Sequence, residues 1–155
     1  MEIPAAPATV TAPAPSNETR TPLPVVLLQG ENLAHQLAQL AAPALRTGSS
    51  GGSLVKSGNL ELRLSVRTTN GGAEVHAHFD DLMIVQQGSA TLITGGTVVD
   101  SQTSGSGETH GTRLEGGQAQ QVKAGDVFII PAGVPHQLLI PAGTTYSALV
   151  AKIQE

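Results

Sequence analysis

The chain of 155 residues contains no cysteine and no tryptophan, and its only aromatic residues are Phe79, Phe128 and Tyr146. Without cysteine, the chain cannot form disulfides, zinc–thiolate sites, iron–sulfur centres or a catalytic thiol. Any metal must therefore be bound by nitrogen and oxygen atoms. Three aromatic side chains are too few for a platform on which bases or sugars stack. The core must be built from aliphatic side chains.

Charged residues are also scarce, at 13% of the chain, and the formal net charge is −4. No cluster of lysine and arginine is present, so the composition argues against nucleic acid as a partner. No apolar run approaches the roughly 18 residues of a membrane-spanning helix, and we expect no membrane segment. The length is typical of one domain with a single hydrophobic core.

The first 24 residues hold six of the ten prolines, mixed with alanine and threonine. Proline fixes the backbone and removes a hydrogen-bond donor, so we predict an extended arm over residues 1–24 and one domain over residues 25–155. Arms of this composition often follow a removed export signal, although residue 1 is not followed by a signal peptide. We therefore expect a periplasmic or secreted protein, with a cytoplasmic location as the alternative.

Hydrophobic periodicity changes along the chain. Leucines at helical spacing predict one short helix over residues 31–42, which Pro43 should end. The Gly/Ser-rich stretch 47–53 is typical of a flexible turn or linker. After it, apolar and polar residues alternate strictly over residues 60–67, which predicts a half-buried strand. Further short apolar runs separated by glycine turns follow, so the sequence favours an all-β sandwich or barrel with one leading helix.

Residues 97–124 are rich in Gly, Ser and Thr in their first half and are long for a hairpin connection. Long loops in compact domains tend to be functional or mobile, and we interpret this segment as a candidate lid. Glu108 and His110 lie in it. We expect them to be a solvated loop pair, with an acid–base pair over a pocket as the alternative.

Two histidines, His76 and His78, are one residue apart. On a strand, residues i and i+2 project to the same face, so these two imidazoles can share one metal ion. Two carboxylates, Asp80 and Asp81, follow at once. A third histidine, His136, leaves a corner shaped by proline and glycine and enters an apolar run, where burial without a partner would be costly. Metal ligation is one way to provide that partner.

These two segments together resemble the cupin family. Its second motif, G-x5-P-x-G-x2-H-x3-N, is matched by Gly125, Pro131, Gly133 and His136, with Ile140 in place of the final Asn. Its first motif, G-x5-H-x-H-x3/4-E-x6-G, is matched by His76, His78 and Gly88, with Asp81 in the glutamate position. The gap from His78 to Asp81 is two residues instead of three or four, and the spacing of the leading glycine is also short. The resemblance covers roughly residues 60–151.

The resemblance implies an all-β fold, a cupin-type antiparallel jelly-roll β-barrel, with a metal in its mouth. It implies His76, His78, Asp81 and His136 as ligands of one divalent transition metal, which is iron, manganese, nickel, zinc or copper. Asp80 is a rival to Asp81, and Asp81 can also serve as a partner that orients a histidine. A metal-free barrel whose histidines are hydrogen-bonded is the alternative to the whole set.

The inward positions beside the site are apolar, and we expect Met83, Phe128 and Ile140 to line a pocket for a small, fairly apolar organic molecule. The first hypothesis is a metal-dependent dioxygenase, isomerase or lyase, with no catalytic residue assigned beyond the ligands. The second is a non-catalytic module that binds a metal or a small ligand. Because an open sheet edge needs a cover, we also expect a homodimer, with the N-terminal arm or residues 53–56 on the partner.

Overall fold

A computed structural model describes residues 24–155, so the predicted arm lies almost entirely outside the described residues. Within the described residues, no helix is both long and apolar enough to span a membrane. One helix precedes thirteen strands. The elements are α1 (Gly30–Thr47), β1 (Ser49–Ser57), β2 (Leu60–Arg67), β3 (Ala73–His76), β4 (Phe79–Gln87), β5 (Ser89–Thr94), β6 (Thr97–Val99), β7 (Gln102–Thr103), β8 (Glu108–Gly111), β9 (Arg113–Glu115), β10 (Gln118–Lys123), β11 (Val127–Ile130), β12 (His136–Leu139) and β13 (Tyr146–Gln154).

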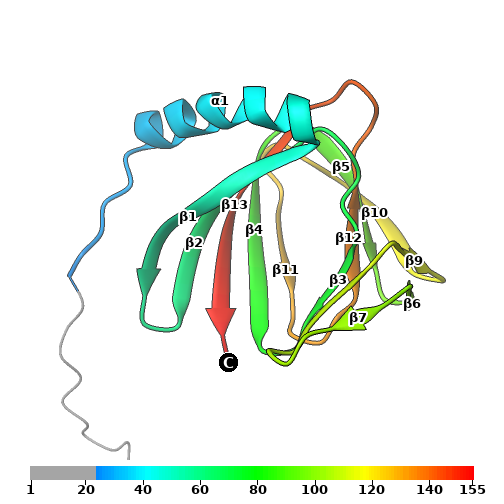
Figure 1. The fold of residues 1–155 in the computed structure, drawn as a ribbon. Coiled ribbons are helices and arrows are strands. Elements are labelled where there is room, and N and C mark those ends of the chain that lie inside the picture. Colours follow the sequence, from blue (N-terminus) through cyan, green and yellow to red (C-terminus); the bar gives the residue numbers. More distant parts are fainter. Residues whose placement is uncertain (1–23) are drawn as a thin grey trace, which may run out of the picture.

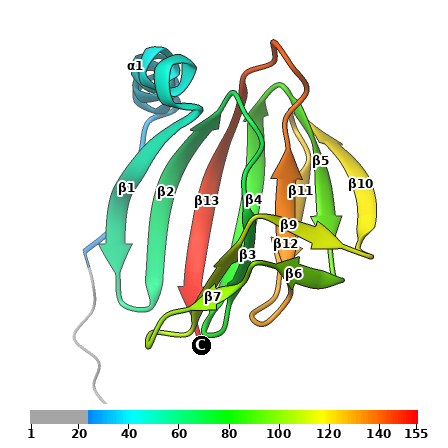
Figure 2. The same ribbon diagram turned by 45° about the vertical axis from the view of Figure 1, so that its right-hand side comes forward.

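The strands form two facing antiparallel sheets (Figure 1). The first has the order β1-β2-β13-β4-β11, and the second has the order β10-β5-β12-β3-β8-β7. A small third sheet pairs β6 with β9. Figure 2 shows β1 and β2 at one end of the first sheet, where they carry α1. The predicted all-β antiparallel jelly roll with one N-terminal helix is confirmed.

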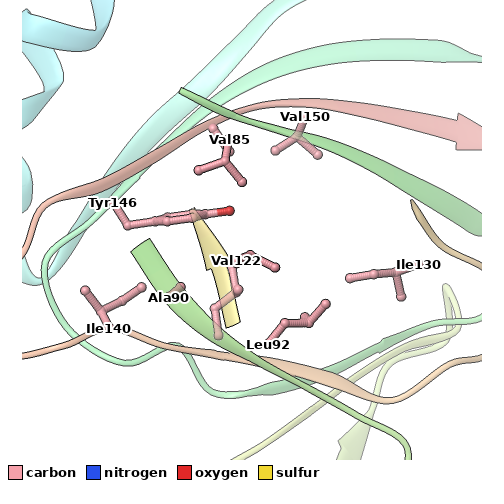
Figure 3. Packing of buried hydrophobic residues seen from close by; sticks show 10 residues of the cluster. Val85, Ala90, Leu92, Val122, Ile130, Ile140, Tyr146 and Val150 are labelled. Carbon is pink, nitrogen blue, oxygen red and sulfur yellow. The ribbon is translucent and has the colours of Figure 1, made fainter. Parts of the chain in front are cut away.

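The hydrophobic core lies between the two large sheets (Figure 3). As the composition requires, it consists almost wholly of small and branched aliphatic side chains, with Tyr146 as its one buried aromatic ring among the described residues. Phe128 and Met83 pack against its margin. Burying such apolar area contributes about 25 cal/mol per Å² to the stability of the fold.

Strand β2 begins and ends as predicted, but its two faces have unexpected partners. The apolar face, with Leu64 and Val66, is buried on the side of α1, where Leu64 and Leu40 line one crevice. The polar face, with Arg63 and Arg67, therefore points to the interior between the sheets. The alternation of apolar and polar residues predicted the strand. It did not show whether the leucines pack on the side of α1 or in the core between the two sheets.

The helix is longer than predicted, because it passes through Pro43 and ends at Thr47. Pro43 lacks the N–H that would bond to the preceding turn, yet the helix continues and is ended by Gly48, whose left-handed backbone donates its N–H to the Ala44 carbonyl at 2.7 Å. The predicted linker 47–53 is also different, since most of it belongs to β1. A Cβ at Gly51 would collide with the Leu64 carbonyl, so glycine allows β1 to pair closely with β2.

The segment 97–124 is not a loop that covers the barrel from outside. It forms β6 to β10, and β8 pairs directly with β3. Glu108 and His110 therefore lie on a strand of the second sheet rather than in a solvated loop. The pairing of β8 with β3 brings Glu108 and His110 beside His76 and Glu74.

Candidate metal centre

Strand β3 organises the site because it lies between β12 and β8. Its register places Glu74 opposite His136 of β12 on one side and opposite His110 of β8 on the other. Two residues along β3, His76 is opposite Glu108. Residues that are opposite each other in an antiparallel pair project to the same face. A cluster of histidines and carboxylates therefore forms on the interior face of the second sheet.

Three members of this cluster are positioned as metal ligands. Glu74, His76 and His136 each offer one ligand atom, and these atoms lie within 4.8 Å of one another. Nε2 of His136 is 3.8 Å from Oε2 of Glu74. The rings of His76 and His136 are tilted with their centroids 5.1 Å apart. Two imidazoles and one carboxylate form a donor set that suits a divalent transition metal.

His136 has the tautomer that a ligand histidine needs. Its Nδ1 lies 3.0 Å from the carbonyl oxygen of Val134, which can only accept, so Nδ1 carries the proton. Its Nε2 therefore presents a lone pair, and this buried atom has no hydrogen-bond partner among residues 24–155. Burial lowers the pKa of His136, which keeps the ring neutral. A buried acceptor without a partner is costly, and a bound cation would satisfy it.

His76 is held between two carboxylates. Its Nδ1 contacts Oε2 of Glu108, and its Nε2 is 3.3 Å from Oδ2 of Asp81. Burial alone would lower the pKa of His76, but the hydrogen bonds to Asp81 and Glu108 outweigh it and raise the pKa above the ordinary histidine value. A carboxylate on one ring nitrogen is the usual way to orient a ligand histidine and increase its basicity.

Asp81 is buried beside His76 and is also bound by Lys152, whose Nζ lies 3.0 Å from its Oδ1. Burial by itself would raise the pKa of Asp81. The hydrogen bond to His76 and the charge of Lys152 act against burial and lower the pKa below the ordinary value. Asp81 is therefore an ionised partner of His76 and Lys152.

The structure brings His76, Asp81 and His136 together, but it does not bring His78 to them. Strand β3 ends at His76, and His78 lies exposed in the bend before β4, so the two histidines do not share a face. The carbonyl of His78 accepts the N–H of Glu155. The rival carboxylate, Asp80, accepts the N–H of Ala132 at 2.8 Å and so supports the corner before β12.

Sequence reasoning missed Glu74, although the spacing contained a signal. Four residues separate His76 from Asp81 and six separate Asp81 from Gly88, which is the spacing of the first cupin motif after its second histidine. His76 thus occupies the place of the second histidine, and Glu74 occupies the place of the first. The short gap after His78 favours this second alignment, in which the first motif begins two residues earlier.

An open pocket of about 510 Å³ lies over the cluster. Its lining includes Glu74 and His76 together with three cationic residues, which are Arg63, Arg67 and Lys152. A smaller cavity of about 50 Å³ lies deeper, and Met83 lines both spaces. Phe128 and Ile140, which were also expected to line the pocket, belong to the hydrophobic core and its margin instead. The pocket is therefore more polar than the sequence suggested, and the carboxylates of Glu74, Asp81 and Glu108 lie in the same lining as the three cations.

No protein-family model and no curated protein matches the chain. Solved structures do match it. The polyketide cyclase RemF from Streptomyces resistomycificus aligns at 18% identity and a TM-score of 0.51, over 70% of this chain and 66% of that chain. A predicted oxalate decarboxylase from Thermotoga maritima aligns at 13% identity and a TM-score of 0.51, over 69% of this chain and 81% of that chain.

The cupin domain of Cnp3 from Schizosaccharomyces pombe also matches, at 11% identity and a TM-score of 0.52, over 69% of this chain and 65% of that chain. The chain thus spans slightly less than two thirds of the polyketide cyclase and of the Cnp3 domain. At these identities the likeness concerns the fold. The chain therefore has a cupin-type fold.

Proposed function

We propose that the protein is a metal-dependent cupin enzyme that holds one divalent transition-metal ion through Glu74, His76 and His136 and acts on a small organic molecule. The observation that carries the proposal is the buried, unpartnered Nε2 of His136, which faces Glu74 and lies beside His76. Compared with the ligand set expected from the sequence, Glu74 takes the place of His78. Asp81 remains next to His76 as its hydrogen-bond partner.

The chain's own residues have distinct tasks in this proposal. His136 presents a neutral lone pair because Val134 fixes its tautomer. In the metal-free protein, Glu108 and Asp81 each bind one ring nitrogen of His76, so a bound metal would displace one carboxylate and leave the other to orient the ring. Lys152 lines the open pocket and binds Asp81 through its Nζ, which fixes the carboxylate beside His76. A bound divalent ion would supply a Lewis acid, and a redox centre if it is iron, manganese or copper.

The open pocket gives a small molecule direct access to the cluster. The donor set does not choose among dioxygenase, isomerase and lyase chemistry, and a non-catalytic module that binds a metal or small ligand is the alternative. Its nitrogen and oxygen donors are compatible with iron, manganese, nickel, zinc and copper. The enzyme and the non-catalytic module would both bind the metal. Only a measurement of substrate turnover therefore distinguishes them.

The test is metal analysis by elemental mass spectrometry on protein purified without a histidine tag, followed by turnover assays on a panel of small organic molecules. We expect about one equivalent of metal in the wild type and a large loss in His136→Ala, since a three-ligand site loses a neutral donor. A rate that disappears on chelation and returns with metal supports the enzyme. Wild-type protein that neither contains nor takes up a metal contradicts the proposal, and tight ligand binding without turnover favours the module.

A further inference from the structure

We propose that Arg67 and Tyr146 form a binding site for the carboxylate of a short organic acid, directly beside the metal centre. This names the substrate class of the pocket, and it rests on the proposed function because a bound cation is needed to offset the charge of Glu74. The site differs from the apolar pocket expected from the sequence. The proposed site depends on the positions of the Arg67 guanidinium on β2 and the Tyr146 hydroxyl on β13.

Arg67 and Tyr146 are register partners. Arg67 is the last residue of β2 and Tyr146 is the first residue of β13, and the two are opposite each other in the antiparallel pair. They therefore project to the same face, which is the interior face of the first sheet. Both line the small cavity of about 50 Å³, together with His136 and Glu74. Arg67 also lines the open pocket of about 510 Å³, so it borders both spaces.

The hydroxyl of Tyr146 is a donor without an acceptor. The side chain is 0% exposed, its oxygen is buried, and that oxygen has no hydrogen-bond partner in the described part of the chain. Figure 3 shows the hydroxyl pointing into the space between the two sheets. Burial raises the pKa of Tyr146 to about 12, so the group stays protonated and its hydrogen needs an acceptor. A buried hydroxyl left in this state destabilises the protein unless something binds to it.

Arg67 is the second donor without a partner. Within residues 24–155, no carboxylate forms an ion pair with it. The other cations of the open pocket are paired, since Arg63 binds Glu61 at 3.1 Å and Lys152 binds Asp81 at 3.0 Å. A half-buried guanidinium that faces a pocket without a counter-ion is available to an anionic ligand.

The chemistry of the two groups selects a carboxylate. A guanidinium offers a planar fork of N–H donors that matches a carboxylate, and a phenol hydroxyl adds one further donor to the same oxygen atoms. The space around them is small and partly apolar. Met83, Ala148 and Val150 line the inner cavity, so a few carbon atoms fit beside the charged group. A short organic acid fits this combination better than a sugar or a nucleotide.

Glu74 explains why the carboxylate needs the metal. Its side chain lines both spaces, and its negative charge opposes an anion at Arg67. A divalent ion bound to Glu74 reverses that charge and adds an attraction to the same anion. The acid is then held between the ion and the pair formed by Arg67 and Tyr146.

The test is isothermal titration of the Mn²⁺-loaded protein with malonate and with its neutral analogue malonamide. We expect malonate to bind at least tenfold more tightly, because only malonate carries the charge that the guanidinium recognises. Arg67→Met should weaken malonate binding by about tenfold or more, and Arg67→Lys should weaken it less. Arg63→Met is the matched control, because Arg63 lies on the same face of β2 but is already paired with Glu61, and we expect a change within about twofold.

A second variant, Tyr146→Phe, keeps the test informative even if Arg67→Met does not fold. Tyr146→Phe keeps the ring and its packing and removes only the oxygen, so we expect a folded protein whose malonate affinity falls by about tenfold. Mn²⁺ stoichiometry should be unchanged in Arg67→Met and Tyr146→Phe, which separates the anion site from the metal centre. Equal affinities for malonate and malonamide, or an Arg67→Met variant with unchanged malonate binding, would overturn the inference and leave the metal centre intact.

If the wild type takes up neither Mn²⁺ nor iron, nickel, zinc or copper ions, the proposed metal centre fails. The same titrations on Glu74→Gln protein, in which the opposing charge is absent, then decide the inference by itself. Malonate binding that depends on Arg67 supports an anion site without a metal. Absence of malonate binding overturns the carboxylate assignment.

Discussion

His136 and Glu74 are opposite each other across β12 and β3, with Nε2 of the histidine 3.8 Å from Oε2 of the glutamate. The two residues are 62 positions apart in the sequence (136 minus 74) and belong to different motifs. The Val134 carbonyl holds the other ring nitrogen, so the only open side of His136 is the one that faces Glu74. This single pair links the corner before β12 to the strand that carries His76.

Glu108 is predicted to position His76. Glu108→Gln keeps the size of the side chain and removes its charge, so it should weaken metal binding by about 10- to 100-fold. Because Glu108 helps to raise the pKa of His76, the variant should also lower that pKa in the metal-free protein. Metal titration and NMR titration of the histidine ring measure the two effects. Glu115→Gln, which changes an exposed glutamate paired with Arg113, is the control and should alter neither.

Asp81 makes the metal-free protein sensitive to acid. Its folded pKa lies below the ordinary value of 3.8, so the ionised carboxylate stabilises the fold above that value and this contribution is lost as the pH falls through the folded pKa. Lys152→Met removes one cause of the lowered pKa. We expect it to cost about 3 kcal/mol of unfolding free energy near neutral pH, and clearly less in acid, where Asp81 is protonated in both proteins.

Chemical denaturation at the two pH values measures this difference. Lys56→Met changes an exposed lysine of β1 and serves as the control. An equal loss of stability at neutral and acidic pH in Lys152→Met would mean that Lys152 acts through packing and not through its charge on Asp81.

The outer face of the first sheet is predicted to form a homodimer. On the edge strand β11, Val127 and Ile129 are 58% and 62% exposed, and Ile153 of β13 adds apolar surface on the same face. An apolar face beside an open sheet edge favours association with a second copy. We expect light scattering to give twice the monomer mass and Ile129→Glu to return the monomer. A monomeric wild type at micromolar concentration contradicts this prediction.

The sequence predicted the strand over residues 60–67 with its bounds, because strict alternation at period two leaves little freedom. It did not predict that the arginine face of this strand points to the interior. Polar residues normally face solvent, and only the position of α1 on the leucine face reverses this. The charged lining of the pocket was therefore not predicted from the local pattern.

Three of the four residues predicted as metal ligands lie close together in the structure. His76, Asp81 and His136 do come together, because the second motif had full spacing around its histidine and the first had correct spacing after Asp81. His78 was included because a strand was assumed to continue through it, whereas β3 ends at His76. Glu74 was not considered for the site, although the motif spacing allows it. Glu108 was considered only as a loop residue, since the pairing of β3 with β8 joins segments that no local signal connects.

The most direct test compares metal binding by Glu74→Gln and His78→Gln, measured as affinity for a titrated divalent ion. The two variants remove one candidate ligand each from positions four residues apart, and His78 is exposed, so neither change should unfold the protein. The account predicts that Glu74→Gln loses at least tenfold in affinity while His78→Gln binds as the wild type does. Loss of the metal in His78→Gln with unchanged binding in Glu74→Gln would contradict the proposed centre.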